Sequence, residues 1–181
     1  AGPLDDVVHL AALIDAIRNA ELNAEIAVVI SNQPDAPGLA RAQSAGIETL
    51  CINHRDYSPR DRHDQAVVRA LQERNVSLVC LAGYMRLVGR PLLEAFPNAM
   101  LNIHPSLLPA FPGTDAQRQA LEYGVKVSGV TVHIVTGELD GGPIVLQRTV
   151  PVLPGDSPDS LAARILIEEH QAYPAAVRIM L

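Results

Sequence analysis

Two polar side chains stand at the end of an apolar segment in the middle of the chain. The segment Leu101–Pro109 reads Leu-Asn-Ile-His-Pro-Ser-Leu-Leu-Pro, and Asn102 and His104 alternate in it with Leu101 and Ile103. Alternate residues of an extended segment share a face, so we expect Asn102 and His104 to point the same way. Pro105 then ends the hydrogen-bonding ladder because proline has no N–H group. The pattern predicts two polar groups at the carboxyl end of a buried strand, where ligands bind in open parallel sheets.

These side chains, with Asp140, have the types that carbonyl chemistry requires. Asn102 offers an amide N–H that can stabilise a developing oxyanion. His104 titrates near neutrality and can donate or shuttle protons. Asp140 precedes Gly141 and Gly142, and pairing with His104 would keep the imidazole protonated. The alternatives are a core histidine with an amide partner and, for Asp140, an ordinary turn residue.

The elements that position these residues follow from hydrophobic periodicity and from cap and turn signals. The pattern predicts helices over residues 10–19, 37–45, 59–73, 91–95, 115–123 and 158–181. It predicts strands over residues 25–30, 47–52, 77–81, 99–104, 127–135 and 143–152. We expect Pro174 to bend or divide the last helix.

The alternation of strands and helices indicates an α/β fold. We expect a single domain over residues 1–181, with an open, mostly parallel sheet and helices on both faces. The last two strands are joined by a short loop, so at least that pair should be antiparallel.

Composition narrows the function classes. The net charge of −6 gives no support to a nucleic-acid partner, and no apolar run is long enough to span a membrane. Cys51 and Cys80 lie in apolar runs, which predicts buried, reduced thiols in a cytoplasmic protein. No cluster has metal-ligand spacing, so we expect no metal cofactor. His54 and His63 lie in polar stretches and are expected to be solvated.

The central segment belongs to a longer pattern. Asn-Ile-His-Pro-Ser-Leu-Leu-Pro is followed by Pro112-Gly113, by Gln119-Ala120-Leu121 and by Leu139-Asp140-Gly141-Gly142-Pro143. The combination resembles the folate-dependent formyltransferases, over residues from about 10 to the C-terminus. The resemblance is closest to members that transfer a formyl group from 10-formyltetrahydrofolate to the amine of glycinamide ribonucleotide in de novo purine biosynthesis. It implies small-molecule substrates, and monomers or homodimers.

The resemblance also implies roles for individual residues. It makes Asn102, His104 and Asp140 the catalytic residues, with a water held by Asp140 that relays a proton between the two nitrogens. His133 and Thr131 would support them. Folate binding is implied for Arg60, Met85, Arg86, Leu87, Val88, Asn102, Val135, Thr136 and Asp140. Binding of the second substrate is implied for Pro105, Gly113 and Glu169.

The first residues depart from the family. Family members place a strand there, followed by a Gly/Ser/Asn-rich turn whose N–H groups bind a phosphate at a helix N-terminus. This chain has Gly2-Pro3-Leu4-Asp5-Asp6 instead, so we expect the first strand and the phosphate turn to be missing or diverged in residues 1–9. Two alternatives therefore stay open: a formyltetrahydrofolate deformylase, which passes the formyl group to water, and a non-catalytic folate-binding remnant.

Overall fold

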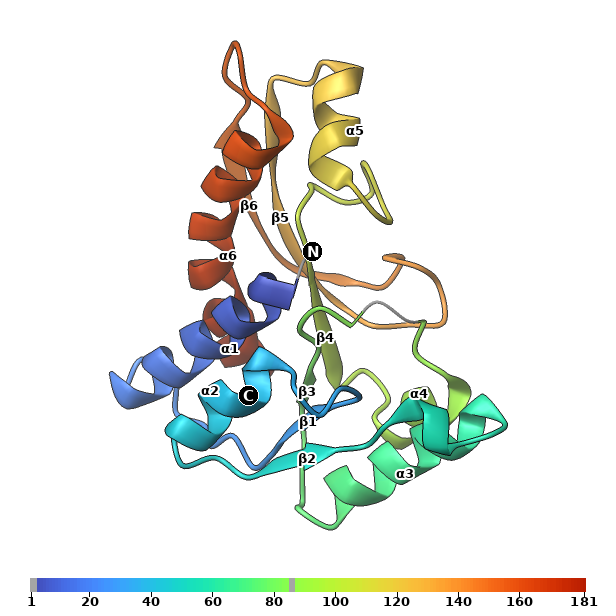
Figure 1. Cartoon of the computed structure of the whole chain (residues 1–181). Helices are drawn as coiled ribbons and strands as arrows, with labels where there is room; N and C mark the ends of the chain where they lie inside the picture. The colour runs from blue at the N-terminus through green and yellow to red at the C-terminus, as the bar shows by residue number, and fades with distance from the viewer. Residues whose placement is uncertain (1–2, 85–86) are drawn as a thin grey trace.

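The computed structural model describes residues 3–84 and 87–181, and it confirms the α/β class (Figure 1). The helices are α1 (Pro3–Arg18), α2 (Pro37–Ser44), α3 (Arg60–Gln72), α4 (Arg90–Ala95), α5 (Ala116–Tyr123) and α6 (Pro158–Met180), with a 3₁₀ turn, η1 (His54–Asp56). The strands are β1 (Val29–Ser31), β2 (Thr49–Cys51), β3 (Val79–Cys80), β4 (Met100–His104), β5 (Val127–Ile134) and β6 (Ile144–Pro151).

The strands pair in two groups. β1 and β2 form a parallel pair, and β3, β4, β5 and β6 form a four-stranded sheet in that order. β3 and β4 are parallel, whereas β4–β5 and β5–β6 are antiparallel. The antiparallel arrangement predicted for the last two strands is confirmed. The pair β4–β5 is antiparallel as well, which the short loop between β5 and β6 did not indicate. After β4 the chain passes through α5 and returns as β5 in the opposite direction (Figure 1).

Helices cover both faces of the sheet, as predicted. Leu101 and Ile103 of β4 belong to an apolar cluster with residues of α1 and α6. Met100 belongs to a different cluster, with residues of α3 and α4. Successive side chains of a strand point to opposite faces, so Asn102 and His104 lie on the Met100 side of β4. In Figure 1, α1 and α6 lie side by side on the left. The helices α3 and α4 lie side by side at the lower right, below β4.

Helix α6 is anchored at both its start and its middle. Ser157 and Ser160 form a reciprocal capping box before the first turn. Tyr173 is fully buried, and its hydroxyl donates to the carbonyls of Leu81 and Leu101. These bonds connect α6 to the residue that follows β3 and to β4. The helix runs through Pro174 without interruption, so of the two predicted effects of this proline, a bend or a division, the division does not occur.

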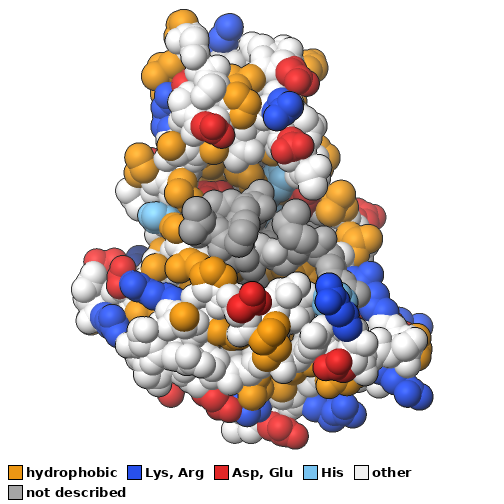
Figure 2. All heavy atoms as spheres, viewed as in Figure 1, with side chains coloured by type: hydrophobic (Ala, Val, Ile, Leu, Met, Phe, Trp, Pro, Cys, Tyr) orange, Lys and Arg blue, Asp and Glu red, His pale blue; other side chains and the backbone are white. Residues whose placement is uncertain are grey.

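The start of the described chain is helical. Helix α1 begins at Pro3, seven positions before the predicted start at residue 10, and residues 3–9 contain no strand. No helix in the described ranges is long and apolar enough to cross a membrane. Acidic and basic side chains are interspersed over the face shown in Figure 2.

Two sequence-based expectations about burial are wrong. Cys51 is exposed, because it ends the short strand β2, whereas Cys80 is partly buried and burial raises the pKa of its thiol to about 12. His63 is buried rather than solvated. Its Nε2 donates to the carbonyl of Ile52 at 3.0 Å, so the first turn of α3 packs its imidazole against the segment after β2.

Candidate active site

The site is built where β4 ends beside β5. The antiparallel register places His133 opposite Asn102 and Thr131 opposite His104. Residues directly opposite each other in an antiparallel pair share a face, so the four side chains stand together. The site therefore contains His133 and Thr131 of β5 in addition to the predicted pair, Asn102 and His104.

His104 is buried and is held through both ring nitrogens. Its Nε2 lies 2.8 Å from the carbonyl oxygen of Phe111. Its Nδ1 lies 3.5 Å from Oδ2 of Asp140. A carbonyl oxygen only accepts, so Nε2 carries hydrogen and Nδ1 is the nitrogen left to exchange a proton. Acceptors therefore face both ring nitrogens, and together they fix the orientation of the imidazole.

Asp140 is held at the centre of the group as a carboxylate. The N–H of Gly113 donates to its Oδ2 at 2.8 Å, and its Oδ1 lies 3.7 Å from Nε2 of His133. The interaction with His133 is the main cause that lowers the pKa of Asp140. The Gly113 N–H and the nearby His104 add to this lowering, while burial opposes it. The carboxyl therefore remains ionised at neutral pH and able to accept protons.

The backbone around Asp140 explains the glycines that follow it. Asp140 has a positive φ of 48°, in the left-handed region that Asp tolerates better than most residues. A Cβ on Gly142 would overlap the carbonyl oxygen of Ile134 at the end of β5. The loop can turn back tightly enough to bring Asp140 to His104 only because residue 142 has no side chain.

His133 lies beside Asn102. It is buried, and its Nδ1 donates to the carbonyl of Ile134 at 3.1 Å. Its Nε2 lies 3.5 Å from the amide nitrogen of Asn102. The same Nε2 faces Oδ1 of Asp140 and lowers the pKa of that carboxyl, so its hydrogen points toward Asp140 and the amide hydrogens of Asn102 are available to a ligand.

Sequence reasoning missed two groups that hold this site, one in the loop after His104 and one on β6. The Phe111 contact to His104 comes from a backbone carbonyl, so no side-chain signal announced it. Gln147 reaches the hydroxyl of Thr131 from β6, and only the strand register, which the sequence does not show, identifies it as a neighbour.

The predicted folate segments come together in part. Val88 and Val135 pack against the same apolar cluster beneath α3 and α4, although they are far apart in the sequence. Thr136 follows at the start of the Asp140 loop, and Leu87 is 54% exposed. Met85 and Arg86 lie outside the described residues. Arg60 is exposed at the first position of α3, and no described hydrogen bond joins it to the His104 group.

The residues predicted to bind the second substrate fall in two places. Pro105 follows His104 directly, and Gly113 contacts Asp140. Glu169 is buried on α6, and its Oε2 lies 3.0 Å from Nε2 of His9 on α1. Within the described residues, this pair is not linked by a hydrogen bond to His104 or Asp140.

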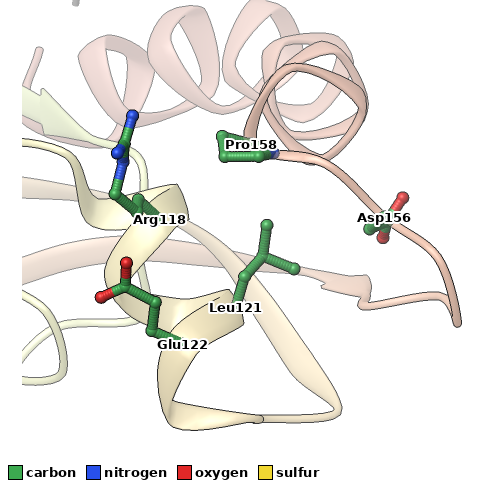
Figure 3. A pocket seen from close by; sticks show the side chains of 5 residues that line it. All are labelled: Arg118, Leu121, Glu122, Asp156 and Pro158. Atoms are coloured by element: carbon green, nitrogen blue, oxygen red, sulfur yellow. The ribbon is translucent and has the colours of Figure 1, made fainter.

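Surface depressions lie away from this group. One, of about 440 Å³, is formed by α5 and the start of α6 and is lined by Arg118, Leu121, Glu122, Asp156 and Pro158 (Figure 3). Another, of about 390 Å³, is lined by Asp56, Tyr57, Ser58, Arg62, Gln65 and Arg69. Neither includes His104, Asp140 or Asn102. In residues 3–84 and 87–181, no group of three or more His, Cys, Asp or Glu side chains is arranged to hold a metal ion.

Comparisons with known proteins show which proteins this chain is similar to. The chain is 45% identical over 172 residues to the human trifunctional purine biosynthetic protein adenosine-3, spanning 95% of this chain but only 17% of that protein. It is 41% identical over 169 residues to phosphoribosylglycinamide formyltransferase of Escherichia coli K12, spanning 93% of this chain and 80% of the relative.

A solved structure shares the fold closely. The crystal structure of glycinamide ribonucleotide transformylase 1 from Symbiobacterium toebii has a TM-score of 0.93 and 55% sequence identity, covering 96% of this chain and 82% of that one. The formyl transferase family model matches residues 5–177, which is nearly the whole sequence. The chain therefore belongs to the formyl transferase family.

Proposed function

We propose that the chain transfers a formyl group from 10-formyltetrahydrofolate to the amine of glycinamide ribonucleotide, in the synthesis of purines. The observation that carries the proposal is the contact of His104 with Asp140, beside Asn102 and on the same face of the sheet. The names of the bacterial relative and of the solved structure support the choice of acceptor.

Formyl transfer makes demands that these side chains can meet. When an amine adds to the formyl carbon, negative charge develops on the carbonyl oxygen, and a proton must pass from the attacking nitrogen to the leaving nitrogen. An amide hydrogen of Asn102 and a hydrogen on Nδ1 of His104 are donors for that oxygen. Such donors act strongly in a partly buried site because little water competes with them.

Asp140 supplies the proton acceptor. Its carboxylate is kept ionised by His133 and by the N–H of Gly113, and it lies close enough to Nδ1 of His104 to stabilise the imidazolium. We propose that Asp140 also holds a water molecule that accepts the proton of the attacking amine and returns one to the leaving nitrogen.

The surroundings fit a flat, partly apolar formyl donor. Leu139, beside Asp140, is 61% exposed and would contact a ring bound against the loop. Val88 and Val135, which belong to the other two predicted folate segments, pack against one apolar cluster. A slot that combines apolar walls with a few fixed polar groups is typical of sites for ring-shaped ligands.

The proposal is tested by measuring formyl transfer from 10-formyltetrahydrofolate to glycinamide ribonucleotide by this 181-residue chain. A parallel reaction without glycinamide ribonucleotide measures hydrolysis. We expect release of tetrahydrofolate that depends on the acceptor amine. Release at the same rate without the amine would contradict the proposal and favour a deformylase.

A second candidate function is a folate-binding protein without turnover. It is motivated by the described residues 3–9, which form the start of α1 where family members place a Gly/Ser/Asn-rich phosphate turn. Binding of the folate without transfer, at acceptor concentrations that saturate related enzymes, would favour this candidate. Acceptor-dependent turnover would exclude it.

A further inference from the structure

A row of three polar residues crosses the sheet at the catalytic histidine. The register places Thr131 of β5 opposite His104 of β4, and Gln147 of β6 opposite Thr131. The three strands are neighbours in Figure 1. Gln147 therefore stands on the same face as His104, one strand further away.

Thr131 connects Gln147 to the segment after His104. The Thr131 side chain is fully buried, and its hydroxyl donates to the carbonyl of Ser106 at 2.7 Å. The same oxygen accepts from the N–H of Leu108 at 3.0 Å and from Nε2 of Gln147 at 2.9 Å. Nε2 of Gln147 also donates to the carbonyl of Leu108 at 3.0 Å. Together the two side chains hold the polar backbone groups of residues 106 and 108.

That segment carries the backbone groups that hold the catalytic side chains. We call residues 105–113 the His104 loop. The hydroxyl of Ser106 donates to the carbonyl of Ala110 at 2.6 Å, next to the Phe111 carbonyl that faces Nε2 of His104. Two residues later, the N–H of Gly113 donates to Asp140. A shift of the His104 loop would therefore move the partners of both His104 and Asp140.

We propose that Gln147 is a positioning residue for the formyl transfer proposed above, on which this inference rests. It acts through Thr131 and Leu108, and it fixes the His104 loop so that the Phe111 carbonyl and the Gly113 N–H stay in place. The role requires a donor at position 147. The Thr131 hydroxyl has given its hydrogen to Ser106, and the Leu108 carbonyl only accepts, so both need the amide hydrogens of Gln147.

The chain offers a matched control for the test. Gln43 also donates from Nε2 to a threonine hydroxyl, that of Thr49, at 3.1 Å, but it lies on α2 away from the His104 loop. Gln147 is exposed on β6, although its two hydrogen bonds are partly buried, so replacing it removes those bonds without opening the core. Gln147→Met and Gln43→Met thus remove the same kind of bond at two places.

We expect Gln147→Met to lower kcat by about 10-fold to 100-fold, with KM for both substrates within about twofold of the parent, because misplaced catalytic groups cost rate more than binding. Gln43→Met should keep the kcat of the parent. A kcat of Gln147→Met within twofold of the parent would overturn the inference, and so would a proportional loss in both variants.

The pH dependence of kcat in Gln147→Glu distinguishes loss of the donor from loss of folding. Its carboxyl can donate to Leu108 only when protonated, so the ratio of its kcat to that of the parent should rise as the pH falls. A ratio that does not change with pH would count against a donor role.

A final measurement separates this inference from the proposed activity. Long-range ¹H–¹⁵N spectra report which ring nitrogen of His104 carries hydrogen, with or without turnover. If the parent chain shows no transfer, the proposed function fails, but a changed His104 signal in Gln147→Met still supports the positioning. An unchanged signal in that variant overturns it.

Discussion

The carboxylate of Asp140 lies 3.5 Å from Nδ1 of His104 while it accepts the N–H of Gly113. One side chain thus joins the loop that follows β5 to the loop that follows β4. His104 is held from its other nitrogen by Phe111, which belongs to the same loop as Gly113. The two loops therefore fix the imidazole from both sides, and the following predictions depend on this arrangement.

His104→Ala should remove nearly all formyl transfer and leave folate binding intact. The substitution deletes the donor that faces the developing oxyanion and the group that Asp140 stabilises. We expect kcat to fall by about 10²-fold to 10⁴-fold, the usual size of an acid–base contribution. Transfer assays give the rate, and isothermal titration calorimetry with the folate gives its Kd. A variant that transfers at the parent rate would refute the assigned role.

Asp140→Asn should change both the rate and its pH profile. The amide keeps a similar shape but removes the negative charge beside Nδ1 of His104, so the protonated imidazole loses its stabilising partner. We expect a large loss of kcat and a basic limb that moves to lower pH. The kcat is measured between pH 5 and 9, with the hydrolysis reaction as the control. An unchanged profile would contradict the pairing.

The same substitution should affect stability in a pH-dependent way. The pKa of Asp140 is lowered in the folded chain, chiefly by His133, so its ionised form stabilises the fold above the pKa of the unfolded carboxyl. This stabilisation is lost as the pH falls through the lower, folded-state pKa. Urea unfolding should show a gap between the parent and Asp140→Asn at pH 7 that narrows on acidification. A gap that widens in acid would show that the sign is wrong.

The sequence predicted the elements better than it predicted their contacts. The Asn-x-His alternation located the end of β4, and the glycine at position 124 marked the end of α5 with a positive φ of 85°. These signals depend on local backbone preferences. The register of β5 against β4 is set by tertiary packing, so the sequence alone left His133, Thr131 and Gln147 without assigned partners.

The burial of polar residues was also poorly predicted. His63 lies in a polar stretch, yet its ring is buried because a backbone carbonyl at Ile52 satisfies it. Glu169 follows another glutamate on α6, yet it is buried against His9. In both cases the partner is distant in the sequence or is a backbone atom, and hydrophobic periodicity contains no information about such partners.

Gly142→Ala should damage the site without touching a catalytic side chain. A methyl group at this position overlaps the carbonyl oxygen of Ile134, so the backbone that carries Asp140 must shift. We expect a loss of kcat of at least about 10-fold, because misplaced catalytic groups lose rate steeply. Gly38→Ala on α2 is the control, since its added methyl group meets no atom within 4 Å. Equal kcat in the two variants would rule out this role for Gly142.

Tyr173→Phe should test the anchor beneath the site. Burial raises the pKa of the Tyr173 hydroxyl well above its usual value, so it remains a donor to the carbonyls of Leu81 and Leu101 at all ordinary pH values. Leu101 immediately precedes Asn102, so the bond ties α6 directly to the catalytic strand. Removing the hydroxyl leaves the Leu81 carbonyl short of a donor, whereas Leu101 keeps the N–H of Leu81, and the loss should lower the free energy of unfolding by about 1–3 kcal/mol.

Urea denaturation of Tyr173→Phe and of Tyr123→Phe gives the comparison. Tyr123 is 81% exposed, so loss of its hydroxyl should change stability by less than about 0.5 kcal/mol. If the anchor also sets the position of β4, Tyr173→Phe should lose kcat even at temperatures where it is fully folded. Full activity together with lowered stability would limit Tyr173 to holding the core, whereas unchanged stability would contradict the anchor itself.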